Sequence, residues 1–245
     1  VLDDSDIDTS IINYVSFIDN YIVEIDYTAS TYKKFKAYQI DRSDGNQIFV
    51  NSIENNNQRD TFTNLPNPEC YSISVIDSCD AQGKVSDSHC FINLSVSSPA
   101  EFVNQLDWTH YVGWTSIDYY NIFKRVKNQS IYFELIAKVD GALNTYRDTG
   151  LCNLDYEYYV QAVNLNGIYK SNSYRVENRP LFTTNPFISN VKNVTVSNED
   201  EIKILWRKSK FNNNMGYELE KYQNDEGNFL YSIPINNNND TSYTD

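Results

Sequence analysis

Cysteine and histidine are the residue types in this chain that could bind a metal ion or form redox-sensitive bonds. The sequence has four cysteines, at positions 70, 79, 90 and 152, and two histidines, at positions 89 and 110. Cys79 ends one β-rich segment and Cys90 begins the next with the same inward parity, so we expect these two to form a disulfide across a hairpin. A zinc site of Cys79, Cys90 and His89 is the alternative, although the spacing matches no zinc ribbon or finger. Cys70 and Cys152 fall in different repeats, and we do not expect them to pair with each other.

Acidic side chains could supply a general acid–base pair or oxygen ligands for a cation. Aspartates stand at positions 3, 4, 6 and 8, without the glycine and terminal glutamate of an EF-hand loop. We interpret this segment as a solvated entry to the first strand. Most other acidic residues fall in turns or on polar strand faces, where a glycosidase pair would have no cleft. No GxSxG, HExxH, P-loop or GxGxxG motif occurs. We therefore predict a noncatalytic chain without a cofactor or bound metal.

The acidic composition narrows the class of partner. The formal net charge is −13 at pH 7, which repels phosphate backbones, so we do not expect nucleic-acid binding. No apolar run reaches the roughly 18–20 residues of a membrane-spanning helix. The sequence opens at Val1 with no methionine and no signal peptide, which we interpret as a mature or fragmentary product.

Short alternating segments fill the stretch from residue 105 to residue 162. Leu106 and Trp108 alternate with polar neighbours, and the segment 156–162 alternates strictly as YEYYVQA. Short strands separated by turns, with almost no helical periodicity, predict an antiparallel β-sandwich. An indole such as Trp108 fills much of the gap between two sheets about 10 Å apart. Tyr156 heads a late strand, where a tyrosine corner is expected.

The same pattern recurs before and after this stretch. Tyr27 occupies the position of Trp108 in an earlier copy, and Trp206 occupies it in a later copy. Tyr71 corresponds in this alignment to Tyr156. The recurrence predicts tandem sandwiches rather than a solenoid.

The predicted repeats span residues 1–97, 98–180 and 181–245. A strand at 92–96 closes the first repeat, and a short proline-containing linker at 97–100 holds its neighbour semi-rigidly. The sequence ends before the tyrosine that would begin the next strand of the third repeat. We therefore expect the third sandwich to lack its last two strands and the chain to belong to a longer polypeptide.

These residues carry a family resemblance. Trp108, Tyr120-x-Ile122, Tyr146 and Tyr156-x-Tyr-x-Val-x-Ala162, followed by a glycine turn, resemble the fibronectin type III domain. The phrases WTHYVGW at 108–114, YNIFKR at 120–125 and TYRD at 145–148 are similar to the fibronectin-like repeats of gliding-motility-associated surface proteins of Bacteroidota, which leave the cell by type IX secretion. In this family a leucine six residues upstream, such as Leu65 before Tyr71, favours a tyrosine corner.

The resemblance implies an extracellular or cell-surface array that acts as a stalk, filament or adhesive spacer. Its partners would be protein or polysaccharide at the cell surface, or the secretion machinery. The alternative is a polysaccharide-binding accessory module of a secreted hydrolase, which would need a row of exposed aromatic rings on one sheet face. Trp114 lies outside the strand pattern, and we expect it either to pack within or between domains or to contact a partner.

Overall fold

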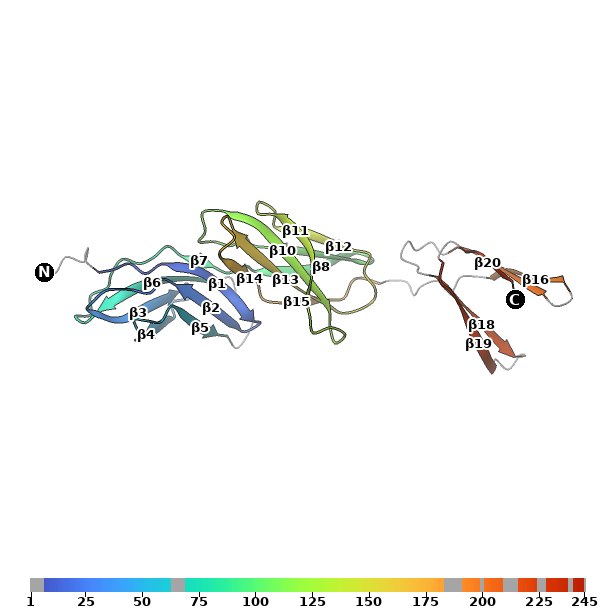
Figure 1. Ribbon diagram of the computed structural model, residues 1–245, viewed down its shortest axis with the longest axis horizontal. Helices are drawn as coiled ribbons and strands as arrows, with labels where there is room; N and C mark the ends of the chain where they lie inside the picture. The colour runs from blue at the N-terminus through green and yellow to red at the C-terminus, as the bar shows by residue number, and fades with distance from the viewer. Residues whose placement is uncertain are drawn as a thin grey trace. The chain divides into compact units, whose positions relative to one another are not determined.

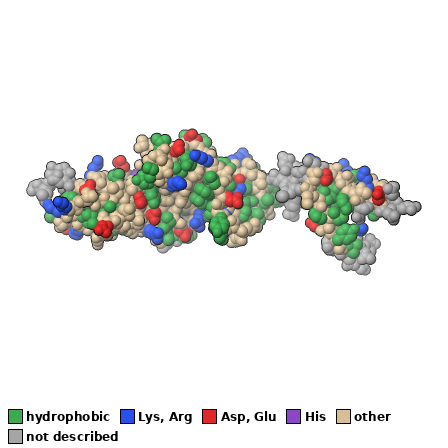
Figure 2. Space-filling model, in the orientation of Figure 1, with side chains coloured by type: hydrophobic (Ala, Val, Ile, Leu, Met, Phe, Trp, Pro, Cys, Tyr) green, Lys and Arg blue, Asp and Glu red, His purple; other side chains and the backbone are tan. Residues whose placement is uncertain are grey.

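The computed structural model describes residues 7–62, 69–182, 191–198, 201–208, 216–223, 228–237 and 240–244. Every regular element in these ranges is a β-strand (Figure 1), so the all-β prediction is confirmed. The chain divides into two units, Val1–Leu181 and Phe182–Asp245. The described ranges hold no helix long and apolar enough to cross a membrane. Figure 2 shows basic, acidic and hydrophobic side chains interspersed over the visible face of the first unit.

The first unit begins with a sandwich of two antiparallel sheets. One sheet has the order β1-β2-β5 and the other the order β4-β3-β6-β7. Alternation builds this core, because Val23, Ile25 and Tyr27 point inward from one strand while Glu24 and Asp26 between them point outward. The strands are β1 (Ile12–Asp19), β2 (Ile22–Tyr27), β3 (Phe35–Arg42), β4 (Gln47–Val50), β5 (Asn57–Thr61), β6 (Cys70–Asp77) and β7 (His89–Cys90).

The second sandwich of this unit repeats the arrangement. Its sheets have the orders β12-β9-β8 and β11-β10-β13-β14, and β15 also pairs with β13. A three-stranded sheet packed on this five-stranded sheet, in this chain order, forms a fibronectin type III-like sandwich. The strands are β8 (Leu94–Ala100), β9 (Val103–Trp108), β10 (Ile117–Val126), β11 (Glu134–Asp140), β12 (Thr145–Thr149), β13 (Tyr156–Asn164), β14 (Lys170–Asn172) and β15 (Val176–Asn178).

The second unit contains two further sheets in its described residues. Their orders are β16-β17-β20 and β18-β19. Trp206 is buried and packs on Tyr217 with ring centroids 5.3 Å apart. Its backbone N–H donates to the carbonyl of Thr241, just as that of Trp108 donates to Asn144. The strands are β16 (Val191–Asn198), β17 (Glu201–Trp206), β18 (Tyr217–Gln223), β19 (Asn228–Ile235) and β20 (Ser242–Thr244).

The boundary between the first two sandwiches differs from the predicted one. Residues 94–100 form β8, which pairs with β9 of the second sandwich, so neither the closing strand expected at 92–96 nor the linker expected at 97–100 exists. Phe91 packs in the first core and Ile92 packs in the second. Alternation showed that this segment is a strand but could not show which sheet it joins. The two sandwiches therefore follow each other without a linker.

The disulfide also differs from the prediction. Cys70 is bonded to Cys90, while Cys79 and Cys152 are free and exposed. In the antiparallel register Cys70 faces Cys90 and Tyr71 faces His89. This register places Cys79 in the turn beyond the end of β6, too far along the chain to face Cys90.

The two tyrosines matched by sequence occupy different positions in their sandwiches. Tyr71 faces Arg42 across β3 and β6, and Tyr158, not Tyr156, holds the equivalent position opposite Lys124 across β10 and β13. Tyr156 is a tyrosine corner, because its hydroxyl accepts a hydrogen bond of 3.1 Å from the backbone N–H of Cys152.

Tyr71 makes a different contact. Its hydroxyl donates to the side chain of Asp60 at 2.9 Å instead of bonding backbone. The expected role of Leu65 lies outside the described residues.

Candidate functional site

The exposed edge of β1 is the first element of the candidate site. β1 is an edge strand, and its outward N–H and C=O groups need partners from outside its own sheet. Side chains of the second sandwich supply them. The N–H of Val15 donates to the hydroxyl of Tyr111 at 2.9 Å, and the carbonyl of Val15 accepts from Oγ of Ser171 at 2.6 Å. Nε1 of Trp114 donates to the carbonyl of Asn13 at 2.7 Å.

Further bonds extend this contact to the end of the strand. The N–H of Asn172 donates to Oγ of Ser16 at 2.9 Å, and the N–H of Arg175 donates to Oδ1 of Asn20 at 2.9 Å. We call this set of hydrogen bonds the β1 clamp. Because it joins the loop after β9 and the β14–β15 segment to one strand, rotation of either sandwich would break several bonds together.

A buried histidine of the first sandwich contacts the Tyr111 hydroxyl of the clamp. Nδ1 of His89 lies 2.8 Å from the Tyr111 hydroxyl. That hydroxyl already accepts from Val15, so its own proton is best donated to Nδ1 of a neutral imidazole. Burial lowers the pKa of His89 to about 4, and Asp87 opposes that shift.

Gly113 allows the loop after β9 to lie close against the His89 ring. A Cβ at this position would lie 2.3 Å from Cγ of the His89 ring, and its φ of +119° is disfavoured for other residues.

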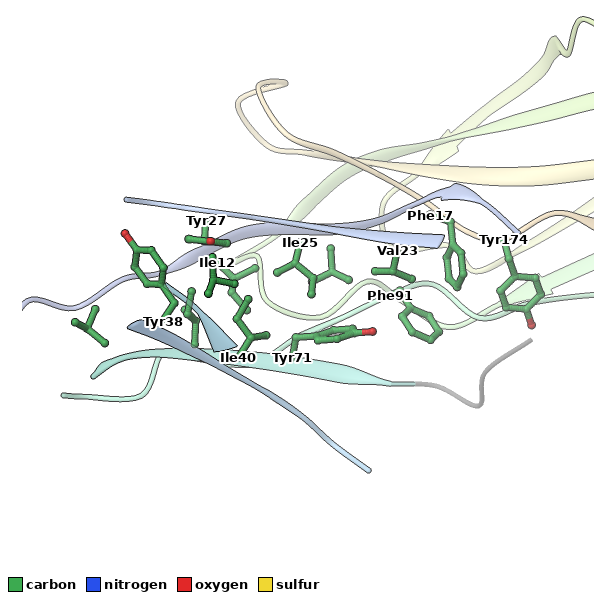
Figure 3. Packing of buried hydrophobic residues seen from close by; sticks show 14 of the residues in the cluster. Ile12, Phe17, Val23, Ile25, Tyr27, Tyr38, Ile40, Tyr71, Phe91 and Tyr174 are labelled. Carbon is green, nitrogen blue, oxygen red and sulfur yellow. The ribbon is translucent and has the colours of Figure 1, made fainter. Parts of the chain in front are cut away.

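An aromatic contact adds to the interface between the first and second sandwiches. We call this interface, which includes the β1 clamp, the joint. Tyr174, which belongs to the second sandwich, packs on Phe17 with centroids 5.5 Å apart, and Phe17 packs on Phe91 at 4.9 Å. Figure 3 shows these three rings together at one end of the first core. Tyr174 also bonds the side chain of Asn93. The joint therefore buries apolar surface as well as polar groups. Separating the two sandwiches would expose this apolar surface to water, which is unfavourable.

Trp114 belongs to this joint. Its ring centroid lies 4.1 Å from that of Tyr111, and its N–H is used by Asn13. Of the two roles expected for it, the structure places it in interdomain packing.

A small pocket opens beside the clamp. Its cavity volume is about 150 Å³, and its walls come from the end of β1, the ring of Phe133, the ring of Tyr159 and the segment 172–175. It is a candidate ligand site because residues of both sandwiches form it.

Candidate metal ligands do not cluster in the described part of the chain. There, no group of three or more His, Cys, Asp or Glu side chains could hold a metal ion. Asp8 accepts a hydrogen bond from the N–H of Thr31 at 2.9 Å, and the aspartates at 3, 4 and 6 lie outside the described residues.

Sequence reasoning identified the buried residues Tyr27, Trp108 and Trp206 but missed the clamp. Ser171 and Tyr111 bond backbone atoms of β1, and backbone atoms carry no residue-specific signal. The one available hint was the Gly113–Trp114 pair standing outside the strand alternation.

No protein-family model matches the chain, and no curated protein matches it either. Among solved structures, the FN1–FN3 domains of chicken CNTN1 are similar at a TM-score of 0.33 and 15% identity, over 72% of this chain and 66% of that one. A two-domain fibronectin type III segment of chicken tenascin has a TM-score of 0.31 and 14% identity, over 70% and 99%. Pectate lyase PelI from Erwinia chrysanthemi, in complex with tetragalacturonic acid, has a TM-score of 0.32 and 23% identity, and the chain spans 28% of its length and aligns over 36% of its own. Scores this low carry no information about ligand or activity.

Proposed function

We propose that the chain is a noncatalytic spacer of the cell surface, in which the first two sandwiches act as one rigid segment. The β1 clamp is the observation that supports this proposal. Adjacent domains are expected to move relative to each other unless their interface is large and apolar. Here bending would break the bonds of Val15 to Tyr111 and Ser171 and would expose Phe17.

An extracellular setting is supported by the covalent chemistry. Cys70 and Cys90 form a disulfide, and such bonds persist in oxidising compartments. The resemblance of residues 108–148 to gliding-associated repeats adds export by the type IX route in a member of the Bacteroidota. A protein or polysaccharide of the cell surface would then be the partner held at a distance by the array.

The free cysteines provide a direct test of location. Cys79 and Cys152 are exposed, so a membrane-impermeant maleimide should label the chain on intact cells of the source organism. The matched control is the Cys79→Ser/Cys152→Ser variant, which should stay unlabelled. Labelling of the wild-type chain only after lysis would overturn the surface location. If a strain without type IX secretion still displayed the label, the export route alone would be wrong.

A further inference from the structure

The pocket beside the clamp has room for a single ring. Its volume is about 150 Å³, and a protein cavity of about 150 Å³ is known to hold one benzene molecule. Both sandwiches contribute to its walls, through Asn20 at the end of β1 and through Tyr159 of β13. Because the β1 clamp fixes these walls, the pocket does not have to be assembled when a ligand arrives.

Aromatic rings form one side of the pocket. Phe133 meets Tyr159 edge to face with centroids 4.9 Å apart. Tyr159 is itself stacked on Phe123 at 4.5 Å with an interplanar angle of 6°. These contacts hold the rings in place, and the faces of fixed aromatic rings attract the polarised C–H groups of a sugar ring.

Two guanidinium groups lie over the Phe133 ring. Cζ of Arg175 is 5.4 Å from the Phe133 centroid, and Cζ of Arg125 is 4.6 Å from it. Arg125 is paired with Glu157. The Arg175 guanidinium has no ion pair or hydrogen bond to any residue the structure describes, and its contact is with the Phe133 ring. A carboxylate is the group that a free guanidinium binds best, through two parallel hydrogen bonds.

The remaining polar groups suit hydroxyls. Oδ1 of Asn20 is occupied by the Arg175 N–H, while its Nδ2 and the Tyr159 hydroxyl have no partner within the described ranges. Asp19 uses Oδ1 to accept from the N–H of Asn20 at 2.5 Å and keeps Oδ2 as a further acceptor. A hydroxylated ring can satisfy this mixture of donors and acceptors, whereas an apolar ring would leave them unpaired.

We propose that this pocket binds one carboxylated sugar ring, a hexuronate unit of an acidic polysaccharide. The carboxylate pairs with Arg175, the ring hydroxyls bond Asn20 and Asp19, and the apolar face of the ring packs on Phe133. This site goes beyond the spacer function, since a rigid segment needs no ligand. It also does not depend on it, because the pocket could bind the same ring wherever the protein resides.

The test compares two trisaccharides that differ only at C6. The full chain is titrated by nuclear magnetic resonance with β-1,4-linked triglucuronate and with cellotriose, its neutral counterpart. We expect triglucuronate to bind at least about tenfold more tightly, which is the scale of one charge-assisted hydrogen bond. We also expect shifts at Tyr159 and Asn20 and weaker binding in high salt.

Matched variants separate the pocket from general charge. Arg175→Gln should lose most of the preference for the acid, while Arg147→Gln, an exposed arginine on β12 of the opposite sheet, should keep it. Tyr159→Phe keeps the ring, removes only the hydroxyl and should weaken binding by a few fold. Equal affinity for the two sugars, equal effects of the two arginine variants, or no saturation by either sugar would overturn the proposal.

Discussion

Each of the two sandwiches of the first unit contains a polar cluster built around one aspartate. In the first, Asp60 accepts from the hydroxyl of Tyr71 at 2.9 Å and from Arg42 at 2.8 Å. In the second, Asp148 accepts from Tyr158 at 2.9 Å and from Lys124 at 3.0 Å, at the equivalent places. Burial raises the pKa of both tyrosines, so each hydroxyl stays a donor.

They differ in what fixes the start of the strand that carries this tyrosine. The first sandwich uses the Cys70–Cys90 disulfide between β6 and β7. The second has no disulfide there and uses the tyrosine corner from Tyr156 to the N–H of Cys152. The same position in one fold is thus held by a covalent bond in one copy and by a hydrogen bond in the other. The comparison predicts that removing the disulfide destabilises the first sandwich, whereas removing the Tyr156 hydroxyl destabilises the second.

The largest contrast is expected between the two aspartates. Asp148→Ala should destabilise the second sandwich by about 3 kcal/mol. Lys124 loses its carboxylate partner, and the buried Tyr158 hydroxyl loses the acceptor to which it donates. Asp60→Ala should cost the first sandwich only about 1–2 kcal/mol, because Arg42 keeps Asp44. Hydrogen exchange of the β6 and β13 amides measures each sandwich separately. Equal losses in the two sandwiches would contradict the reasoning.

Removing the disulfide should affect only the first sandwich. Cys70→Ala/Cys90→Ala opens a loop with a sequence separation of 20, which corresponds to about 3 kcal/mol. The amides of β6 and β7 should exchange faster, while those of β13 should not change. Faster exchange throughout both sandwiches would show that they unfold as one cooperative unit.

Acid should loosen the joint through His89. Its pKa of about 4 in the folded chain lies below the ordinary 6.5. The unfolded chain therefore binds the proton more readily, so this contribution is complete above about pH 6.5 and is lost as the pH falls through 4. The expected loss is about 2–3 kcal/mol. His89→Gln keeps a side-chain partner for Tyr111 without titrating near pH 4–6.5, and its stability should fall less on acidification. Parallel pH curves for the two chains would rule out this histidine as the cause.

The smallest effect is expected at the tyrosine corner. Tyr156→Phe removes one hydrogen bond to the N–H of Cys152 and should cost about 1 kcal/mol. Urea unfolding followed by tryptophan fluorescence can measure this loss. A cost as large as that of the disulfide would mean that the corner does more than fix the strand start.

The sequence predicted the parts of this structure that depend on alternation. Tyr27, Trp108 and Trp206 were identified because a buried strand face repeats every second residue. The same period explains the misplaced tyrosine, since Tyr156-x-Tyr158-x-Val gives identical parity when shifted by two residues.

The joint could not be predicted in the same way. β8 alternates equally well whichever sheet it joins, so its pattern did not place the domain boundary. The β1 clamp bonds the backbone of Asn13 and Val15, where residue identity carries no information. The pocket depends on Arg175 and Asn20 meeting across the boundary, which requires the three-dimensional arrangement.

The rigid joint is the central claim, and the chain carries a natural pair of probes for it. Cys79 lies in the first sandwich, Cys152 lies in the second, and both are free and exposed. Spin labels on these thiols report their separation by double electron–electron resonance. We predict one narrow distance distribution in the full chain, and a broad one when Tyr111→Phe and Trp114→Ala remove two bonds of the clamp. A distribution that is already broad in the wild-type chain, and unchanged by these substitutions, would contradict the account.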